Sequence, residues 1–120
     1  MIVALWIVNA LLALATLASG GMKVARPKPA LAAAGMTWAD DFSVPQVKGI
    51  GTIEVVGALG LILPLSTGIA PILTPIAAVG FVVVFIGAII THARRHEGFV
   101  PALVLLLLSI ASAVLGFLVV

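Results

Sequence analysis

A single carboxylate within an apolar segment is the main candidate for chemistry in this chain. Glu54 lies in the run KGIGTIEVVGALGLILP, residues 48–64, which otherwise has the composition of a membrane-spanning helix. An ionisable side chain at membrane depth costs about 2.5 kcal/mol or more to insert, so it normally faces a bundle interior and pairs with another group. We therefore expect Glu54 to face a neighbouring helix, in a functional pocket or as a packing residue.

The residues around Glu54 predict a close contact with that neighbouring helix. Gly51, Glu54 and Gly57 follow one another at a spacing of three, which places them on one helical face. Small residues on one face allow another helix to approach closely within a membrane. Lys48 precedes Glu54 by about 9 Å along the helix axis. The carboxylate is thus expected inside the apolar layer but not at its centre.

A second group of candidates lies in the segment THARRHEGF, after the third apolar run. His92, Arg94 and Arg95 are expected in the same half of the bilayer as Glu54. A carboxylate beside such groups can form an ion pair, a proton relay, or an acid and base lining a small pocket. The alternative is that Glu54 only fixes helix packing. Sequence spacing leaves both interpretations open, because helix neighbours cannot be identified from it.

The two histidines do not predict a metal site. His92 and His96 have the spacing of one helical face and could bind a metal with Glu97 or Glu54. However, no longer metal motif accompanies them, and the helix is expected to end there, so we interpret them as solvated residues at the membrane surface. The chain has no phosphate loop, nucleophile elbow or dinucleotide fingerprint, and its cofactor is unknown.

The composition indicates a small integral membrane protein. Of the 120 residues, 63% are apolar and only 8% are charged. Since a spanning helix takes about 20 apolar residues, four spans would use about two thirds of the chain. The absence of cysteine excludes disulfides and thiol chemistry. The basic residues flank apolar runs, which favours the lipid bilayer as the partner and not a nucleic acid.

We therefore predict an all-α fold, a membrane-embedded four-helix bundle forming a single transmembrane domain over residues 1–120. A short interfacial segment, residues 27–41, separates the first two helices. Ser43 and Gln46 have the spacing of a capping box at the start of the second helix. Asn9 lies within the first helix. We expect its side chain to make an interhelical or backbone hydrogen bond in preference to a contact with a ligand. The predicted spans are about residues 2–22, 44–64, 70–92 and 99–120.

The basic residues also predict the orientation. All six border the connection between the first two spans or that between the last two, and these connections share a side of the membrane. By the positive-inside rule, both connections are cytoplasmic and both termini lie outside an inner (cytoplasmic) membrane. The basic residues are Lys23, Arg26, Lys28, Lys48, Arg94 and Arg95.

The runs KGIGTIEVVGALGLILP, TGIAPILTPIAAVGF and GAIITHARR resemble the DoxX-like family of small four-helix membrane proteins. The resemblance covers roughly Val47 to Arg95. Relatives of this name have been linked to membrane quinone and sulfur oxidation and to oxidative-stress assemblies, so the resemblance implies a role beside a redox partner. The positions that match the family pattern are Lys48, Gly51, Glu54, Gly57, Pro64, Pro75 and His92.

Three functions are compatible with these observations. The first is an accessory or partner-binding subunit of a membrane redox process, in which the glycine faces bind a partner membrane or redox protein. The second is a small enzyme acting on a lipophilic substrate, with Glu54 as acid or base and His92 assisting. The third, a carrier of small solutes or protons, ranks last because the outer half offers few polar groups. Small-residue faces on several helices also predict a homo-oligomer.

Overall fold

Four long helices make up most of the protein in the computed structural model, which describes residues 1–120. Each of the four is long and apolar enough to cross a membrane. There is no strand, so the predicted all-α, four-helix fold is confirmed. A short helix and a 3₁₀ helix lie between the first two long ones. The elements are α1 (Ile2–Ala25), α2 (Lys28–Ala33), η1 (Thr37–Asp41), α3 (Val44–Thr67), α4 (Leu73–Arg94) and α5 (Val100–Val119).

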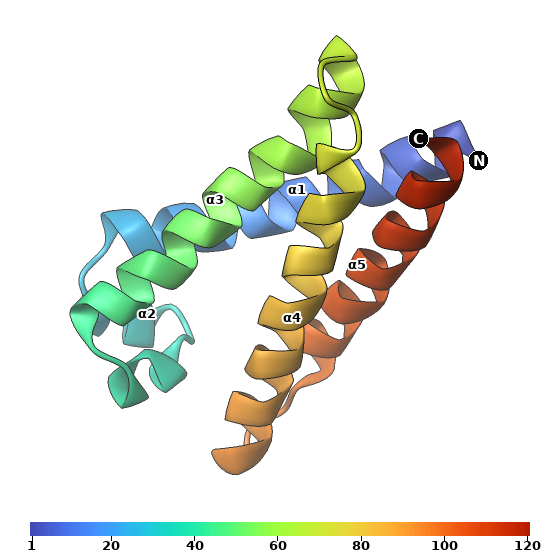
Figure 1. The fold of residues 1–120 in the computed structure, drawn as a ribbon. Coiled ribbons are helices and arrows are strands. Elements are labelled where there is room, and N and C mark those ends of the chain that lie inside the picture. Colours follow the sequence, from blue (N-terminus) through green and yellow to red (C-terminus); the bar gives the residue numbers. More distant parts are fainter.

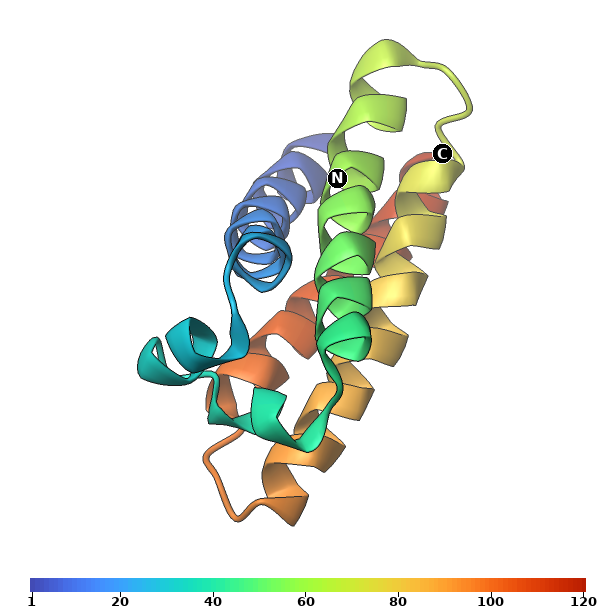
Figure 2. The ribbon, with the colours of Figure 1, turned by 90° about the vertical axis from the view of Figure 1, so that its left-hand side faces the viewer.

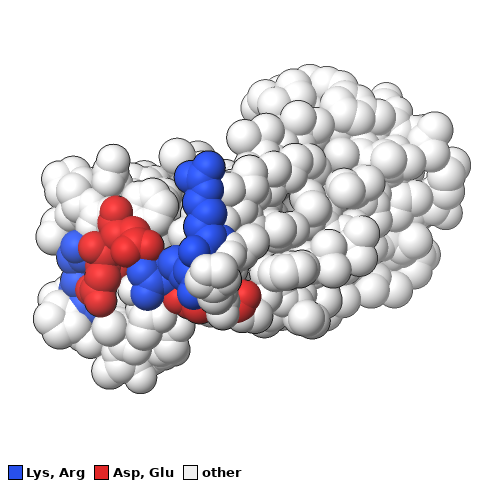
Figure 3. All heavy atoms as spheres, turned by 90° about the horizontal axis from the view of Figure 1, so that it is seen from below, with Lys and Arg blue, Asp and Glu red and all other residues white.

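The long helices form two pairs. In Figure 1, α1 runs along α3, and α4 runs along α5. Both termini and the α3–α4 turn lie toward one end of the bundle, whereas α2, η1 and the α4–α5 connection lie at the other (Figures 1 and 2). The two pairs spread apart toward this second end, which we call the charged end because the Lys, Arg, Asp and Glu residues belong to it. Seen from below in Figure 3, charged side chains gather on part of this surface, and the rest is uncharged.

Helix α3 begins and ends with recognisable caps. The Ser43 hydroxyl accepts a hydrogen bond from the Gln46 N–H at 3.2 Å, and the Gln46 side chain accepts one from the Ser43 N–H at 2.9 Å. The predicted capping box is thus confirmed. At the other end Gly68 adopts a left-handed conformation with φ of 71°, which favours glycine.

Helix α3 continues through Pro64, where the predicted span ends, as far as Thr67. A proline within a helix has no N–H to donate to the carbonyl four residues earlier, which here belongs to Gly60. The Thr74 hydroxyl of α4 donates to that Gly60 carbonyl at 3.1 Å. The neighbouring helix thus supplies the donor that Pro64 lacks, and α3 and α4 are tied together at this point.

A buried polar contact joins three helices in the half of the bundle nearest the termini. Asn9 of α1 is fully buried and donates to the Leu61 carbonyl of α3 at 3.0 Å. Its side-chain oxygen accepts a hydrogen bond from the Ser112 hydroxyl of α5 at 2.5 Å. Around it lies the apolar core, which includes Leu12, Phe81 and Phe85. Asn9 therefore makes interhelical contacts inside a packed core.

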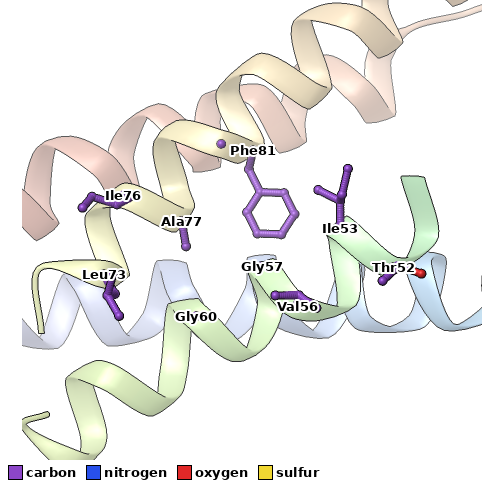
Figure 4. A pocket seen from close by; sticks show the side chains of 10 residues that line it. Thr52, Ile53, Val56, Gly57, Gly60, Leu73, Ile76, Ala77 and Phe81 are labelled. Carbon is purple, nitrogen blue, oxygen red and sulfur yellow. The ribbon is translucent and has the colours of Figure 1, made fainter. Parts of the chain in front are cut away.

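The glycine face of α3 is covered by helices of the same chain. A Cβ atom added to Gly51 would lie 2.7 Å from the Gly20 carbonyl oxygen of α1 and 2.6 Å from the Lys23 Cβ. A Cβ added to Gly57 would lie 2.6 Å from the Phe81 ring of α4, which points toward Gly57 in Figure 4. Gly51 and Gly57 thus serve contacts within the chain.

The α1–α3 contact gives a matched test of close packing. Gly51→Ala should lower the free energy of unfolding by about 1–3 kcal/mol, because the added methyl group collides with backbone that cannot move aside. Gly49→Ala, two positions earlier on α3, places its Cβ in open space and should leave stability unchanged or slightly higher. Unfolding of the detergent-solubilised variants by heat or by SDS measures both. Equal stabilities of the two variants would contradict the close contact.

Candidate functional site

The partner of Glu54 is Lys23, near the end of α1. The Lys23 ammonium donates a hydrogen bond to the Glu54 carboxylate, and the pair is buried, with 7% and 3% of the two side chains exposed. Lys23 also donates to the Ser19 hydroxyl at 2.9 Å. Its Nζ lies 5.2 Å from the centre of the Trp38 ring, a cation–π distance. The ammonium therefore has a carboxylate, a hydroxyl and an aromatic face around it.

The local sequence explains how a charged pair becomes buried here. Ser19 and Lys23 are four residues apart, so they share a face of α1, with Gly20 beside them. Gly20 and Gly51 let the two backbones approach, and the Lys23 stem passes directly over Gly51. Two charges removed from water need excellent geometry, and removal of one partner of such a pair typically costs about 3–5 kcal/mol.

A cavity of about 430 Å³ adjoins the ion pair. Residues of α1, η1, α3, α4 and α5 line it, so it lies between the two helix pairs where they spread apart. Gly87 and Ala88 of α4 are small and leave room on that side. Ile53 and Val83 line the cavity and are also exposed on the outside of the bundle, so it opens toward the lipid. Its polar side chains are Ser19, Lys23, Glu54, Thr91 and His92.

A network of charged groups holds η1 against the other connection. Arg95 binds the Asp41 carboxylate of η1 at 2.7 Å and also pairs with Glu97. Thr37 of η1 donates to Glu97 at 3.4 Å, and the second Glu97 oxygen lies 3.2 Å from His92 Nδ1. Because η1 carries Trp38, which lines the cavity, this network fixes one cavity wall. We call the contacts of Arg95 with Asp41 and Glu97 the latch.

The latch changes the titration of its own members. The hydrogen bond from Arg95 holds the pKa of Glu97 below its ordinary value, and the hydrogen bond to His92 acts in the same direction. The two carboxylates, Asp41 first, raise the pKa of Arg95 further above its already high value. Both effects favour the charged forms, so the latch is fully formed at neutral pH.

The structure brings some of the predicted site residues together and separates others. Glu54 and His92 line the same cavity. Arg95 belongs to the latch, and Arg94 is exposed and makes no ion pair, so neither is the partner of Glu54. Lys48 is exposed and donates to the Val24 carbonyl at the end of α1 at 2.8 Å.

The two histidines do not share a helical face. Helix α4 ends at Arg94, and His96 lies beyond it with φ of 55°, in the left-handed region. His92 is bound to Glu97 instead, close to the cavity. The i, i+4 spacing of the sequence therefore does not translate into a pair of imidazoles on one side of a helix.

Sequence reasoning missed Lys23 and Trp38 as site residues. The predicted first span ends at residue 22, which makes Lys23 a flanking charge, whereas α1 continues to Ala25. One signal could have identified it: Ser19, Gly20 and Lys23 form a small and polar face like that of α3. Trp38 lies within the predicted interfacial segment, and its position over Lys23 depends on how the first connection folds.

Comparison with known proteins gives one match. A family model described as the DoxX-like family matches residues 7–114 of the chain. The chain has no significant match among the curated proteins or the solved structures.

The lowered pKa of Glu97 predicts that acid opens the latch. Its interaction with Arg95 is fully present above the ordinary carboxyl pKa of 4.5 and is lost as the pH falls through the lowered value. In a Trp6→Phe background, Trp38 emission should therefore shift to longer wavelength as the pH falls from 4.5 through the lowered pKa of Glu97 and η1 moves toward water. Fluorescence titration of the solubilised protein measures this shift.

Two variants control this titration. Glu97→Gln should flatten the acid transition, because the amide cannot titrate. Asp40→Asn should preserve it, because Asp40 neighbours Asp41 on η1 but makes no ion pair. An acid shift of equal size in the Glu97→Gln variant would show that protonation of Glu97 does not control the movement.

Proposed function

The chain belongs to the DoxX-like family and is a multi-pass membrane protein, and we propose that it binds a lipophilic molecule with a polar head in the cavity beside Lys23 and Glu54. One observation carries this proposal: the buried ion pair of the chain adjoins a cavity of about 430 Å³ that opens toward the lipid. Ligand sites are typically concave and mostly apolar, with a few convergent polar groups.

The chemistry of the cavity walls indicates what kind of head would fit. Lys23 is a hydrogen-bond donor, Glu54 an acceptor, and His92 can be either. The paired ammonium and carboxylate carry no net charge, so they favour an uncharged head with carbonyl or hydroxyl groups. Apolar residues such as Phe85 and Leu105 line the remainder, where a ring or an acyl tail would lie.

The second part of the proposal is that the protein has an accessory role in a membrane redox process. A quinone is a flat ring with carbonyl acceptors and an apolar tail, so it meets the description of the head and tail given above. We propose that the protein holds such a carrier for a partner redox protein, since the chain itself has no cysteine for thiol redox chemistry. The cavity supports the binding part, and the family resemblance supports the redox part.

Binding is proposed ahead of catalysis and transport. An enzyme would use Glu54 as acid or base with His92, and both do line the cavity. However, the carboxylate is already engaged by Lys23, so contact with a substrate would have to displace that partner. A carrier needs a polar path toward the termini, where the buried polar groups Asn9, Thr74 and Ser109 bind helix carbonyls.

Association with other chains is a separate part of the proposal. We propose that a partner protein or a second copy binds the apolar groove between α3 and α4 shown in Figure 4, which Gly57 and Gly60 also line. This groove has a volume of about 410 Å³, and Ile53, Val56 and Ile76 line it with exposed side chains. Native mass spectrometry counts the chains in the assembly directly, and a strictly single chain would refute this part.

A cavity-filling variant tests ligand binding. Gly87 lines the cavity, and a Cβ added there would meet no atom within 4 Å, so Gly87→Leu should fill cavity space without disturbing the fold. Gly49→Leu is the matched control, since a Cβ at Gly49 also meets no atom within 4 Å, and Gly49 lines neither this cavity nor the groove between α3 and α4. Native mass spectrometry of protein extracted gently from its own membrane should show a bound lipophilic molecule in wild type and Gly49→Leu, but not in Gly87→Leu. Equal occupancy in all three proteins, or none in any, would contradict the proposal.

The polar end of the site is tested by the double variant Lys23→Met with Glu54→Leu. Replacing both partners by apolar side chains leaves no unpaired charge, so the bundle should stay folded. Hydrogen bonds to charged groups are worth about 1.5–3 kcal/mol, so affinity for a quinone analogue should fall about 10- to 100-fold. Unchanged affinity in a folded double variant would show that the ion pair has only a packing role.

The orientation is also a proposal: both termini outside, and both connections at the charged end in the cytoplasm of an inner (cytoplasmic) membrane. Its support is the gathering of the basic residues at one end of the bundle. Because the chain has no cysteine, single cysteines report unambiguously. Ser66→Cys, in the last turn of α3, should react with an impermeant maleimide on intact cells, whereas Ala34→Cys should react only after permeabilisation. The reverse pattern would invert the orientation.

A further inference from the structure

A second hollow lies outside the proposed ligand cavity, where α1 ends and α3 begins. Its volume is about 470 Å³. No acidic residue lines it, although the chain has acidic residues close by at the same end. Four basic side chains line it: Lys23, Arg26, Lys28 and Lys48.

Three of these four cations have no carboxylate partner. Lys23 is neutralised by Glu54. Lys28 instead donates to the Phe42 carbonyl at 2.5 Å, and Lys48 donates to the Val24 carbonyl. Arg26 is exposed and makes no ion pair. The hollow thus gathers an excess of positive charge, whereas Arg95, at the same end of the bundle, is balanced by two carboxylates.

The position of the hollow matches the depth of lipid headgroups. It lies at the C-terminus of one spanning helix and the N-terminus of the next, where the apolar layer gives way to water. Val24 and Val44, at those two helix ends, expose apolar side chains next to the basic groups. A molecule bound there would meet cations at one end and an apolar surface at the other.

The backbone that presents these cations is constrained. Pro27 and Pro29 flank Lys28 and line the hollow, and each proline ring fixes the φ angle of its residue. The Lys28 and Lys48 hydrogen bonds hold the connection against Phe42 and the end of α1. Because the backbone of this connection is already held in place, it loses less conformational entropy when an anion binds, which favours binding.

We infer that this hollow binds the phosphate group of an anionic phospholipid. Basic pockets between transmembrane helices commonly bind anionic headgroups, since each Lys or Arg near the surface adds attraction to the negative lipid. This inference does not depend on the ligand of the Glu54 cavity, because a different set of side chains carries it.

The test compares lipids on the purified, delipidated full chain in detergent. Titration followed by native mass spectrometry should show tighter binding of phosphatidylglycerol than of phosphatidylcholine. The double variant Arg26→Gln with Lys48→Gln should bind phosphatidylglycerol about fivefold more weakly for each charge removed. Arg94→Gln is the matched control, because it removes an exposed, unpaired cation of the same end that does not line the hollow, and it should bind like wild type.

Several outcomes would overturn the inference. Equal binding of the two lipids would exclude recognition of the negative charge, and equal losses in the double variant and Arg94→Gln would exclude the hollow as the site. Displacement of phosphatidylglycerol by an equal concentration of inorganic phosphate would assign a soluble-anion site instead. The salt concentration provides a test on the unaltered protein. A higher salt concentration should weaken the binding of phosphatidylglycerol and leave the binding of phosphatidylcholine unchanged. If salt affected both lipids equally, the inference would be overturned even if the double variant misfolds.

Discussion

The buried ion pair of Lys23 and Glu54 is the interaction on which the charged half of the molecule depends. Neither charge is stable in an apolar layer without the other, so α1 and α3 must meet at one depth and in one rotation about their axes. Gly20 and Gly51 make that contact close enough for the pair to form. Trp38 then packs over the ammonium, which ties the first connection to the same point. The position, the close packing and the polarity of the site thus all depend on the contact between α1 and α3.

The two halves of the bundle use their polar groups differently. Toward the termini, Asn9 joins three helices, and Thr74 binds the carbonyl that Pro64 leaves without a donor, so polar groups there close the bundle. Toward the charged end the helix pairs separate (Figure 1), and the latch of Arg95 with Asp41 and Glu97 joins the two connections. A cavity persists where the helices diverge, because only a short 3₁₀ helix spans the distance between them.

The sequence predicts the features that depend on local residue spacing and on composition. The four-helix membrane fold, the DoxX-like family, the capping box at Ser43 and the burial of Glu54 on a small-residue face all follow from short patterns. The partner of Glu54 did not, since it depends on which helices are neighbours. Lys23 lay just past an apolar run and had the pattern of an ordinary flanking charge. The latch joins residues far apart in the chain, and no local signal relates Asp41 to Arg95.

Lys23 lies at the boundary of two regions that differ in net charge, and this separates their ligands. On the cavity side, its ammonium is balanced by Glu54, so an anion entering there would meet the carboxylate and gain no net attraction. On the other side, Arg26, Lys28 and Lys48 have no such counter-charge, and an anion is attracted. An amphipathic molecule with an uncharged head therefore suits the cavity, and a phosphate-bearing lipid suits the hollow. The carboxylate of Glu54 is therefore what distinguishes the two regions, because without it Lys23 would give the cavity side an excess of positive charge as well.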